Sequence, residues 1–263
     1  MPDTGPLFLW SAPRARSTAF CRMMIERGDF TVFHEPFSAL VVQGHVVVED
    51  RRIATTDDLV AELTALSRRR PVFVKETTEY RYDAIDHPSL PATGTHTFLI
   101  RSPRDAIASH YAMNPGVRCE EVGFRHLHEI YERVGRAGGR RPAVLEAEEL
   151  VRDPQGTVRR YCDAVGIPFL DAALTWRAGH RPEWSRTTRW AEGVARSTGF
   201  QHREHDYPVT VDNNAELARF YAREAPFYER LRAQSLTGPQ SLTGPHSLTG
   251  PHSRTQPHSG AAR

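Results

Sequence analysis

The chain has 263 residues, a formal net charge of +2 at pH 7 and 39% hydrophobic residues. This length suits one α/β domain with a tail, and a charge near zero predicts no general attraction to nucleic acid or to an anionic membrane surface. The three cysteines, Cys21, Cys119 and Cys162, are widely spaced, which favours neither a disulfide framework nor a zinc site and is typical of a reduced cytoplasm.

Apolar blocks typical of strands alternate with helical stretches along the chain. Strands are predicted at residues 7–10, 30–33, 71–75, 96–101 and 143–147, and helices at 17–27, 56–68, 103–113, 120–136, 154–165 and 214–232. Gly28 suits the C-terminal cap of the first helix, and Pro226 is expected to kink or split the last one. The alternation predicts an α/β fold with a mainly parallel five-stranded sheet flanked by helices.

The first apolar block also bears on localisation. It is far shorter than the core of a signal peptide and is followed at once by Arg14 and Arg16, an order unlike that of secretion signals. No segment reaches transmembrane length, so we expect a cytoplasmic protein without a membrane span.

A candidate anion site follows the first strand. Residues 11–18 read SAPRARST and open a helix, so backbone N–H groups, the guanidinium groups of Arg14 and Arg16 and the hydroxyls of Ser17 and Thr18 are available to a phosphate or sulfate. The segment lacks the glycines and the lysine of GxxxxGK[ST], which disfavours magnesium-dependent ATP chemistry. The alternative interpretation is an exposed arginine-rich turn.

A second candidate anion site lies at residues 98–109, FLIRSPRDAIAS. A strand ends at Arg101, a helix begins at Pro103, and Ser109 follows eight residues after the arginine. An arginine can grip a phosphate with two charge-assisted hydrogen bonds, and the serine adds a neutral donor. The alternative is that Arg104 and Asp105 merely cap and solvate the start of the helix.

Together the two segments resemble PAPS-dependent sulfotransferases of the bacterial small-molecule type. PRARST resembles the family's 5′-phosphosulfate loop, which reads PKSGTT or PRSGST, with Arg16 at the usual glycine and Ala15 within the loop. Arg101 and Ser109 match the arginine and serine of the 3′-phosphate motif. More faintly, Ser197, Thr198 and Gly199 resemble a loop that closes over the nucleotide, and residues 226–231 resemble the family's terminal helix.

This resemblance implies a P-loop nucleotide-kinase-like sulfotransferase fold and a specific reaction. The donor would be 3′-phosphoadenosine-5′-phosphosulfate (PAPS), the product adenosine 3′,5′-bisphosphate, and the acceptor a small hydroxylated molecule, with no metal required. Arg14 and Lys75 stand where the family places lysines beside the leaving and transferring groups. Lys75 is the only lysine among 34 basic residues, although a strand-end lysine reaching solvent is the alternative.

The acceptor hydroxyl must lose a proton, so a general base is expected. The family's KTH segment supplies a histidine, but Thr77 occupies that position here. Glu35, in FHEPF directly after the second strand, is the preferred candidate because some bacterial sulfotransferases use a glutamate in this region. Glu76 and His34 are alternatives, and a simply solvated turn is the interpretation without a function.

The C-terminal stretch repeats a hexapeptide from Ser235: SLTGPQ, SLTGPH, SLTGPH and SRTQPH. Its glycine, proline and serine content predicts a disordered tail at 235–263, after a sulfotransferase domain at 1–234. Two other functions stay open. Thr77 and Arg16 favour a catalytically idle nucleotide-binding protein of the same fold, and a nucleoside or nucleotide kinase is the third possibility. The sequence does not address the oligomeric state.

Overall fold

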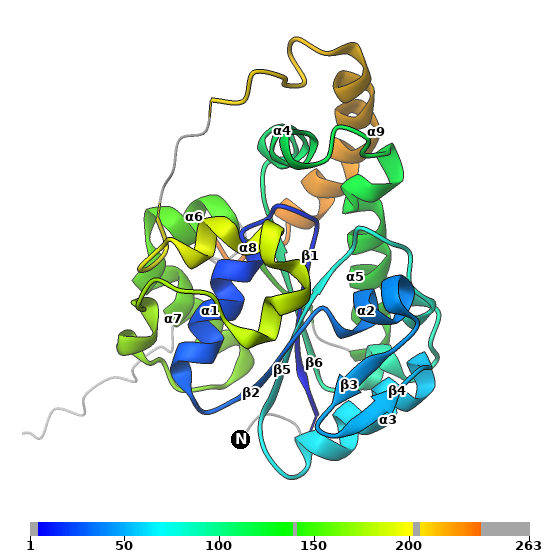
Figure 1. The fold of residues 1–263 in the computed structure, drawn as a ribbon, viewed down its shortest axis with the longest axis vertical. Coiled ribbons are helices and arrows are strands. Elements are labelled where there is room, and N and C mark those ends of the chain that lie inside the picture. Colours follow the sequence, from blue (N-terminus) through cyan, green and yellow to red (C-terminus); the bar gives the residue numbers. More distant parts are fainter. Residues whose placement is uncertain (1–4, 139–140, 202–205, 238–263) are drawn as a thin grey trace, which may run out of the picture.

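The computed structural model describes residues 5–138, 141–201 and 206–237 of the chain (Figure 1). Its centre is a five-stranded sheet in the order β2-β5-β1-β6-β7, in which all neighbouring strands are parallel. The strands are β1 (Leu7–Ser11), β2 (Thr31–His34), β5 (Val72–Thr77), β6 (Thr95–Ile100) and β7 (Ala143–Glu146). The predicted fold class and all five predicted strands are confirmed.

Helices cover both faces of the sheet (Figure 1). One face packs against α1 (Ser17–Arg27), α6 (Ala147–Arg152) and α7 (Pro154–Val165), with α8 (Thr188–Ala195) beside α1. The other face packs against α2 (Pro36–Gln43), α3 (Thr56–Ser67), α4 (Pro103–Met113), α5 (Phe124–Gly138) and α9 (Ala215–Arg232).

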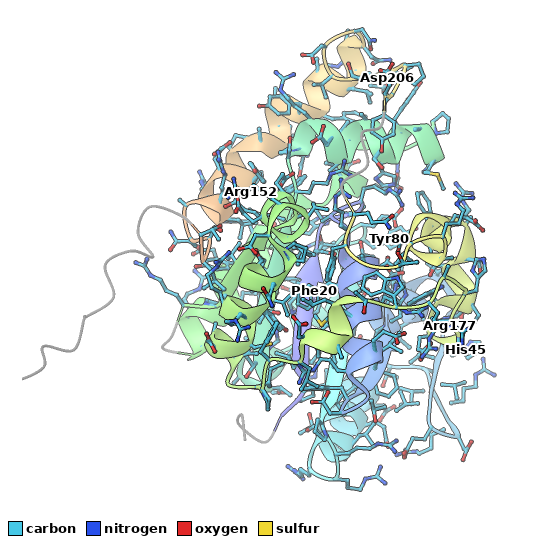
Figure 2. The ribbon with its side chains drawn as sticks, turned by 90° about the vertical axis from the view of Figure 1, so that its left-hand side faces the viewer. Phe20, His45, Tyr80, Arg152, Arg177 and Asp206 are labelled. Atoms are coloured by element: carbon cyan, nitrogen blue, oxygen red, sulfur yellow. The ribbon has the colours of Figure 1, made fainter. Side chains whose placement is uncertain are left out.

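Strand β1 shows why the sheet has two cores. Leu7 and Leu9 point into the core that contains Phe20 of α1, whereas Phe8 and Trp10 point into the opposite core. All five residues of β1 are buried, as expected for a central parallel strand covered on both faces. Figure 2 shows Phe20 deep among the side chains of the first core.

Two helix predictions need correction. The predicted helix at 120–136 is interrupted, because a 3-10 helix at Cys119–Val122 ends at Gly123 and α5 begins at Phe124. Gly123 has φ 84°, and a Cβ there would lie 2.6 Å from the carbonyl oxygen of Thr78, so this close approach needs glycine. Pro226 does not split α9, whose apolar side chains pack against α4 and α5 on both sides of the proline.

Several short elements were not predicted. They include α2, α6, α8 and a small antiparallel hairpin of β3 (Val46–Val48) and β4 (Arg51–Ile53). Four further 3-10 helices lie at Asp83–Ile85, Leu90–Ala92, Asp171–Leu174 and Pro182–Thr187. These segments are too short for a periodic pattern to stand out from the surrounding sequence.

The start of the predicted tail lies on the sheet. Ser235 is buried and forms a bridge with Val144 of β7, and the Leu236 N–H donates to the Val144 carbonyl oxygen at 2.9 Å. Residues 235–237 therefore belong to the packed body, and the rest of the predicted disordered tail lies outside the described residues. The division at 234/235 otherwise stays a prediction. Within the described ranges, no helix combines the length and apolar character needed to cross a membrane.

His96 on β6 predicts how stability depends on pH. Trp10 Nε1–H donates to His96 Nδ1 at 2.9 Å, and burial lowers the pKa of His96 from 6.5 to about 4. Between these two pH values, His96 is protonated in the unfolded chain but stays neutral in the folded chain. The free energy of unfolding should therefore fall by about 3 kcal/mol as the pH drops through this window.

Urea unfolding at neutral pH and near the folded pKa of about 4 measures this loss. His96→Asn should reduce the acid sensitivity by that amount. His34, whose pKa burial also lowers to about 4, remains in both proteins and cancels from the comparison. Parallel pH dependences in the wild type and the variant would contradict the prediction.

Candidate active site

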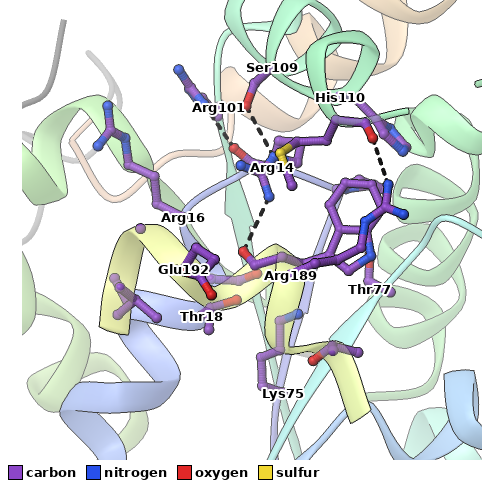
Figure 3. Close-up of a pocket in the computed structure, with 18 of the residues that line it drawn as sticks. Arg14, Arg16, Thr18, Lys75, Thr77, Arg101, Ser109, His110, Arg189 and Glu192 are labelled. Carbon is purple, nitrogen blue, oxygen red and sulfur yellow. Dashed lines mark hydrogen bonds between the residues drawn. The ribbon is translucent and has the colours of Figure 1, made fainter. Parts of the chain in front are cut away.

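A cleft of about 820 Å³ lies at the carboxyl ends of β1, β2, β5 and β6 (Figure 3). In parallel sheets ligands bind at this edge. Most of the predicted site residues line it, namely Arg14, Arg16, Ser17, Thr18, Glu35, Lys75, Arg101, Ser109, Ser197 and Gly199. Two do not: Ala15, within the loop, is fully buried, and Thr198 is exposed but is not among the residues that line the cleft.

The loop after β1 has an unusual backbone. Arg14 (φ 65°) and Arg16 (φ 64°) both adopt the left-handed conformation. This conformation costs a non-glycine residue on the order of 1–2 kcal/mol, which accounts for the glycine that sulfotransferase-like loops carry at position 16. Arg16 is the N-cap of α1, and no described side chain caps that helix. The first backbone N–H groups of α1 therefore face the cleft without a side-chain acceptor. They are available to donate hydrogen bonds to a bound anion.

The two predicted anion sites meet in space. Arg14 Nε donates to Ser109 Oγ at 3.0 Å, and Arg101 donates through a terminal guanidinium nitrogen to the Arg14 carbonyl oxygen at 3.1 Å. Figure 3 shows the Arg14 side chain directed to Ser109 and Arg101 on the side of the Arg14 backbone, with Lys75 at a different level of the cleft. Segments far apart in the sequence therefore form one cationic surface.

Lys75 and Glu35 form an ion pair in the cleft. Nζ of Lys75 contacts Oε1 of Glu35, and only 3% of the Lys75 side chain is exposed. Glu35 has φ 56°, is the N-cap of α2, and donates its N–H to the Lys75 carbonyl oxygen at 2.7 Å. Burial would raise the pKa of Glu35, but the adjacent Lys75 ammonium, together with His34 and Arg186, outweighs this effect and lowers the pKa to about 2. Glu35 is thus held as a carboxylate beside a cation.

The two alternative bases differ in placement. The Glu76 carboxylate accepts hydrogen bonds from the N–H groups of Phe37, Ser38 and Thr77, and it is not among the described residues that line the cleft. Burial raises its pKa to about 8. Glu76 therefore holds the start of α2 in place through these hydrogen bonds.

His34 lines the cleft but is almost fully buried against Trp184. Its Nδ1 is 3.8 Å from Glu35 Oε2, and its Nε2 has no partner among the described residues. Burial keeps His34 neutral at physiological pH by lowering its pKa to about 4. Of the three candidates, Glu35 has the carboxylate that faces the cleft.

Comparison with known proteins shows the family to which the chain belongs. A family model described as the sulfotransferase domain matches residues 6–235. The chain belongs to this sulfotransferase family.

Two Arabidopsis thaliana relatives, named branched-chain-amino-acid aminotransferase-like proteins 2 and 1, are 32% and 30% identical to it. The alignments cover 76% and 89% of this chain but 37% and 42% of theirs, so the chain spans about two-fifths of their length. The solved structure of a sulfotransferase from Alicyclobacillus acidocaldarius aligns with a TM-score of 0.47 and 14% identity, over 87% of this chain and 94% of that chain.

Sequence reasoning missed one wall of the sulfotransferase cleft. The segment from Pro182 through α8 crosses it, where Arg186 donates to the His34 carbonyl oxygen at 3.0 Å and Arg189 to that of Met113 at 2.6 Å. The carbonyl oxygen of Trp190 accepts from Arg14 at 3.4 Å. The run RTTRW at 186–190 could have indicated this wall. Basic and aromatic residues on a short helix, however, do not form a pattern that is specific to a binding site.

The charges of this sulfotransferase cleft favour a polyanion. Its described lining has seven cationic side chains, Arg14, Arg16, Lys75, Arg101, Arg186, Arg189 and Arg196, against three carboxylates, Glu35, Glu79 and Glu192. Fixed cations in a concave site raise the local concentration of anionic ligands. The part of the chain that the structure describes has no cluster of three or more potential metal-ligand side chains.

The loop at Ser197 to Gly199 is held beside the first anion site. Trp176 Nε1–H donates to Ser197 Oγ at 3.1 Å, and the Trp176 N–H donates to the Thr198 carbonyl oxygen at 3.0 Å. Arg16 reaches the same loop by donating to the Gln201 carbonyl oxygen at 3.1 Å. This predicted nucleotide loop therefore lies next to PRARST.

Proposed function

We propose that this sulfotransferase moves a sulfuryl group from PAPS to the hydroxyl of a small-molecule acceptor. The observation that carries the proposal is the contact between the two anion motifs. Arg101 holds the Arg14 carbonyl oxygen and Arg14 holds Ser109, in the same cleft as the Lys75–Glu35 pair. A nucleotide with phosphate groups at both ends needs two cationic sites in one cleft, beside a reacting centre.

The donor is assigned to the two motifs by charge and position. Arg101 and Ser109 bind the 3′-phosphate, and the loop at residues 14–18 with the start of α1 binds the 5′-phosphosulfate. Arg14 faces Ser109 in the structure. To assist the leaving group, its guanidinium must therefore turn from Ser109 toward Lys75 when the donor binds.

Glu35 and Lys75 have different roles in the proposed reaction. The acceptor oxygen attacks sulfur and its proton passes to a Glu35 carboxylate oxygen. The bond from sulfur to the bridging oxygen breaks, and adenosine 3′,5′-bisphosphate leaves with that electron pair. Lys75 neutralises the charge on the sulfuryl oxygens. When bound PAPS also contacts the Lys75 ammonium, the attraction between this ammonium and Glu35 weakens. The pKa of Glu35 then rises from about 2 toward the value that a base needs.

The proposed localisation of the protein is the cytoplasm, which is a reducing compartment. Cys21, Cys119 and Cys162 are all free thiols. Free cysteines are typical of the cytoplasm, which supports the proposed localisation.

Ligand-induced stabilisation separates the three candidate functions. Adenosine 3′,5′-bisphosphate without magnesium should raise the melting temperature more than ATP does, since a ligand that binds only the folded state stabilises it. Transfer of radiolabelled sulfate from PAPS to hydroxylated acceptors should follow. Stronger protection by magnesium-ATP would favour a kinase. Protection by the bisphosphate without transfer to any acceptor would favour an idle binding protein.

Arg101→Ala should weaken binding of the bisphosphate by about ten- to a hundred-fold, because a charged hydrogen-bond donor to phosphate is lost. Calorimetric titration measures the change. Arg104→Ala is the matched control, since Arg104 pairs with Asp212 at the surface and is half-exposed. Equal affinities of the two variants would remove Arg101 from the phosphate site.

A further inference from the structure

Helix α2 forms a track that leads away from the proposed base. Glu35 is its N-cap, and Ser38 and Val42 also line the cleft. Residues three and seven positions after the cap share one stripe of a helix. At 1.5 Å per residue, Val42 lies about 10 Å along the axis from Glu35. One wall of the cleft thus runs from the reacting centre to the outer end of α2.

The outer end of this track is apolar. The sequence of α2, PFSALVVQ, contains no charged residue. Val41 and Val42 are 52% and 63% exposed, and Val47 on β3, which packs against α2, is 56% exposed. Three of the four large hydrophobic side chains that the described chain exposes lie on α2 and on the adjoining strand β3. We call Val41, Val42 and Val47 the valine patch.

Neighbouring helix α3 provides a contrast. Its surface has Asp57 and Asp58 in the first turn, followed by Glu62, which pairs with Arg51. Surface helices normally present such charged residues to solvent. The uncharged surface of α2 is therefore a local feature of the cleft wall.

We infer that the acceptor carries an apolar arm, which leaves the reacting hydroxyl at Glu35 and lies along Ser38 and Val42 toward the valine patch. This inference rests on the proposed function and specifies its acceptor class. The patch continues the cleft wall through Val42, which links it to the reacting centre. Three valines make a surface far smaller than the ~1,200 Å² or more that a stable protein partner buries. An apolar arm gains affinity from every methylene that it buries there, whereas a polar arm does not.

A homologous series of unbranched primary alcohols tests the inference. Half-burial on the track should raise kcat/KM about two-fold for each added methylene, or roughly fifteen-fold from n-butanol to n-octanol. Val42→Asp should reduce this octanol-to-butanol ratio to near one. Leu170→Asp is the matched control because Leu170 is also exposed, at 37%, but precedes the 3-10 helix at Asp171–Leu174, which packs against α1 on the opposite face of the sheet. It should retain the ratio.

Binding of the same alcohols to the enzyme saturated with adenosine 3′,5′-bisphosphate gives a readout independent of turnover. Affinity that rises with chain length and is lost in Val42→Asp supports the apolar track, even if no sulfate is transferred and the proposed function fails. Transfer to n-butanol with no gain for n-octanol overturns the inference but leaves the proposed function intact. Absence of binding at every chain length, or a dimer that Val42→Asp dissociates, also overturns it.

Discussion

Glu35→Gln is expected to lower the rate of sulfuryl transfer by about 10²–10⁴-fold, the usual contribution of a positioned general base. The amide keeps the size of the side chain and can still accept a hydrogen bond from Lys75, but it cannot take the proton of the acceptor. The affinity for adenosine 3′,5′-bisphosphate should change little, because Glu35 lies beside Lys75 and does not take part in the contacts that Arg14 makes with Ser109 and Arg101. Single-turnover rates with radiolabelled PAPS, together with calorimetry, measure both quantities.

Glu192→Gln is a suitable comparison. It removes another carboxylate of the cleft wall, one that pairs with Arg196 near the surface, and should retain most of the rate. If Glu35→Gln were fully active, the base would be His34, the other candidate that lines the cleft. Glu76 would not replace it, since its carboxylate accepts from two N–H groups at the start of α2 and from the N–H of Thr77 on β5.

Lys75→Met is expected to lower the rate by about 10²–10³-fold, as the loss of one positioned cation or donor at a reacting centre does. It should also change the pH dependence. The Lys75 ammonium holds the pKa of Glu35 at about 2 against the effect of burial. Without the ammonium, only His34 and Arg186 oppose the effect of burial, so the pKa should rise from about 2 and the variant should lose activity on the acid side at a pH where the wild type is unaffected.

The pH–rate profile of kcat/KM is the measurement, with Lys75→Arg as the control. Arginine keeps the positive charge beside Glu35, so its profile should stay flat on the acid side even if the bulkier guanidinium slows the reaction. Profiles of identical shape for the methionine and arginine variants would show that Lys75 does not set the charge state of Glu35.

Local sequence patterns predicted most of the fold. The five strands are apolar blocks, and α1, α4 and α7 have the predicted bounds because a glycine cap or a first-turn proline marks an end. Helix α5 begins four residues later than predicted, since Gly123 breaks the helix where it approaches Thr78, a contact with a distant segment. The site was predictable to the extent that its residues follow strands directly, as Glu35 and Arg101 do.

The sequence by itself determined which residues could bind anions or accept a proton, because these follow from residue type and from position at the end of a strand. It did not decide among Glu35, Glu76 and His34. Side chains of adjacent strand residues point to opposite faces, so Lys75 and Glu76 on β5 must separate. Only the packing of α1 and α8 on one face and of α2 on the other decided that Lys75 meets Glu35 in the cleft while Glu76 anchors a helix. Such long-range contacts depend on the strand order, which no local pattern encodes.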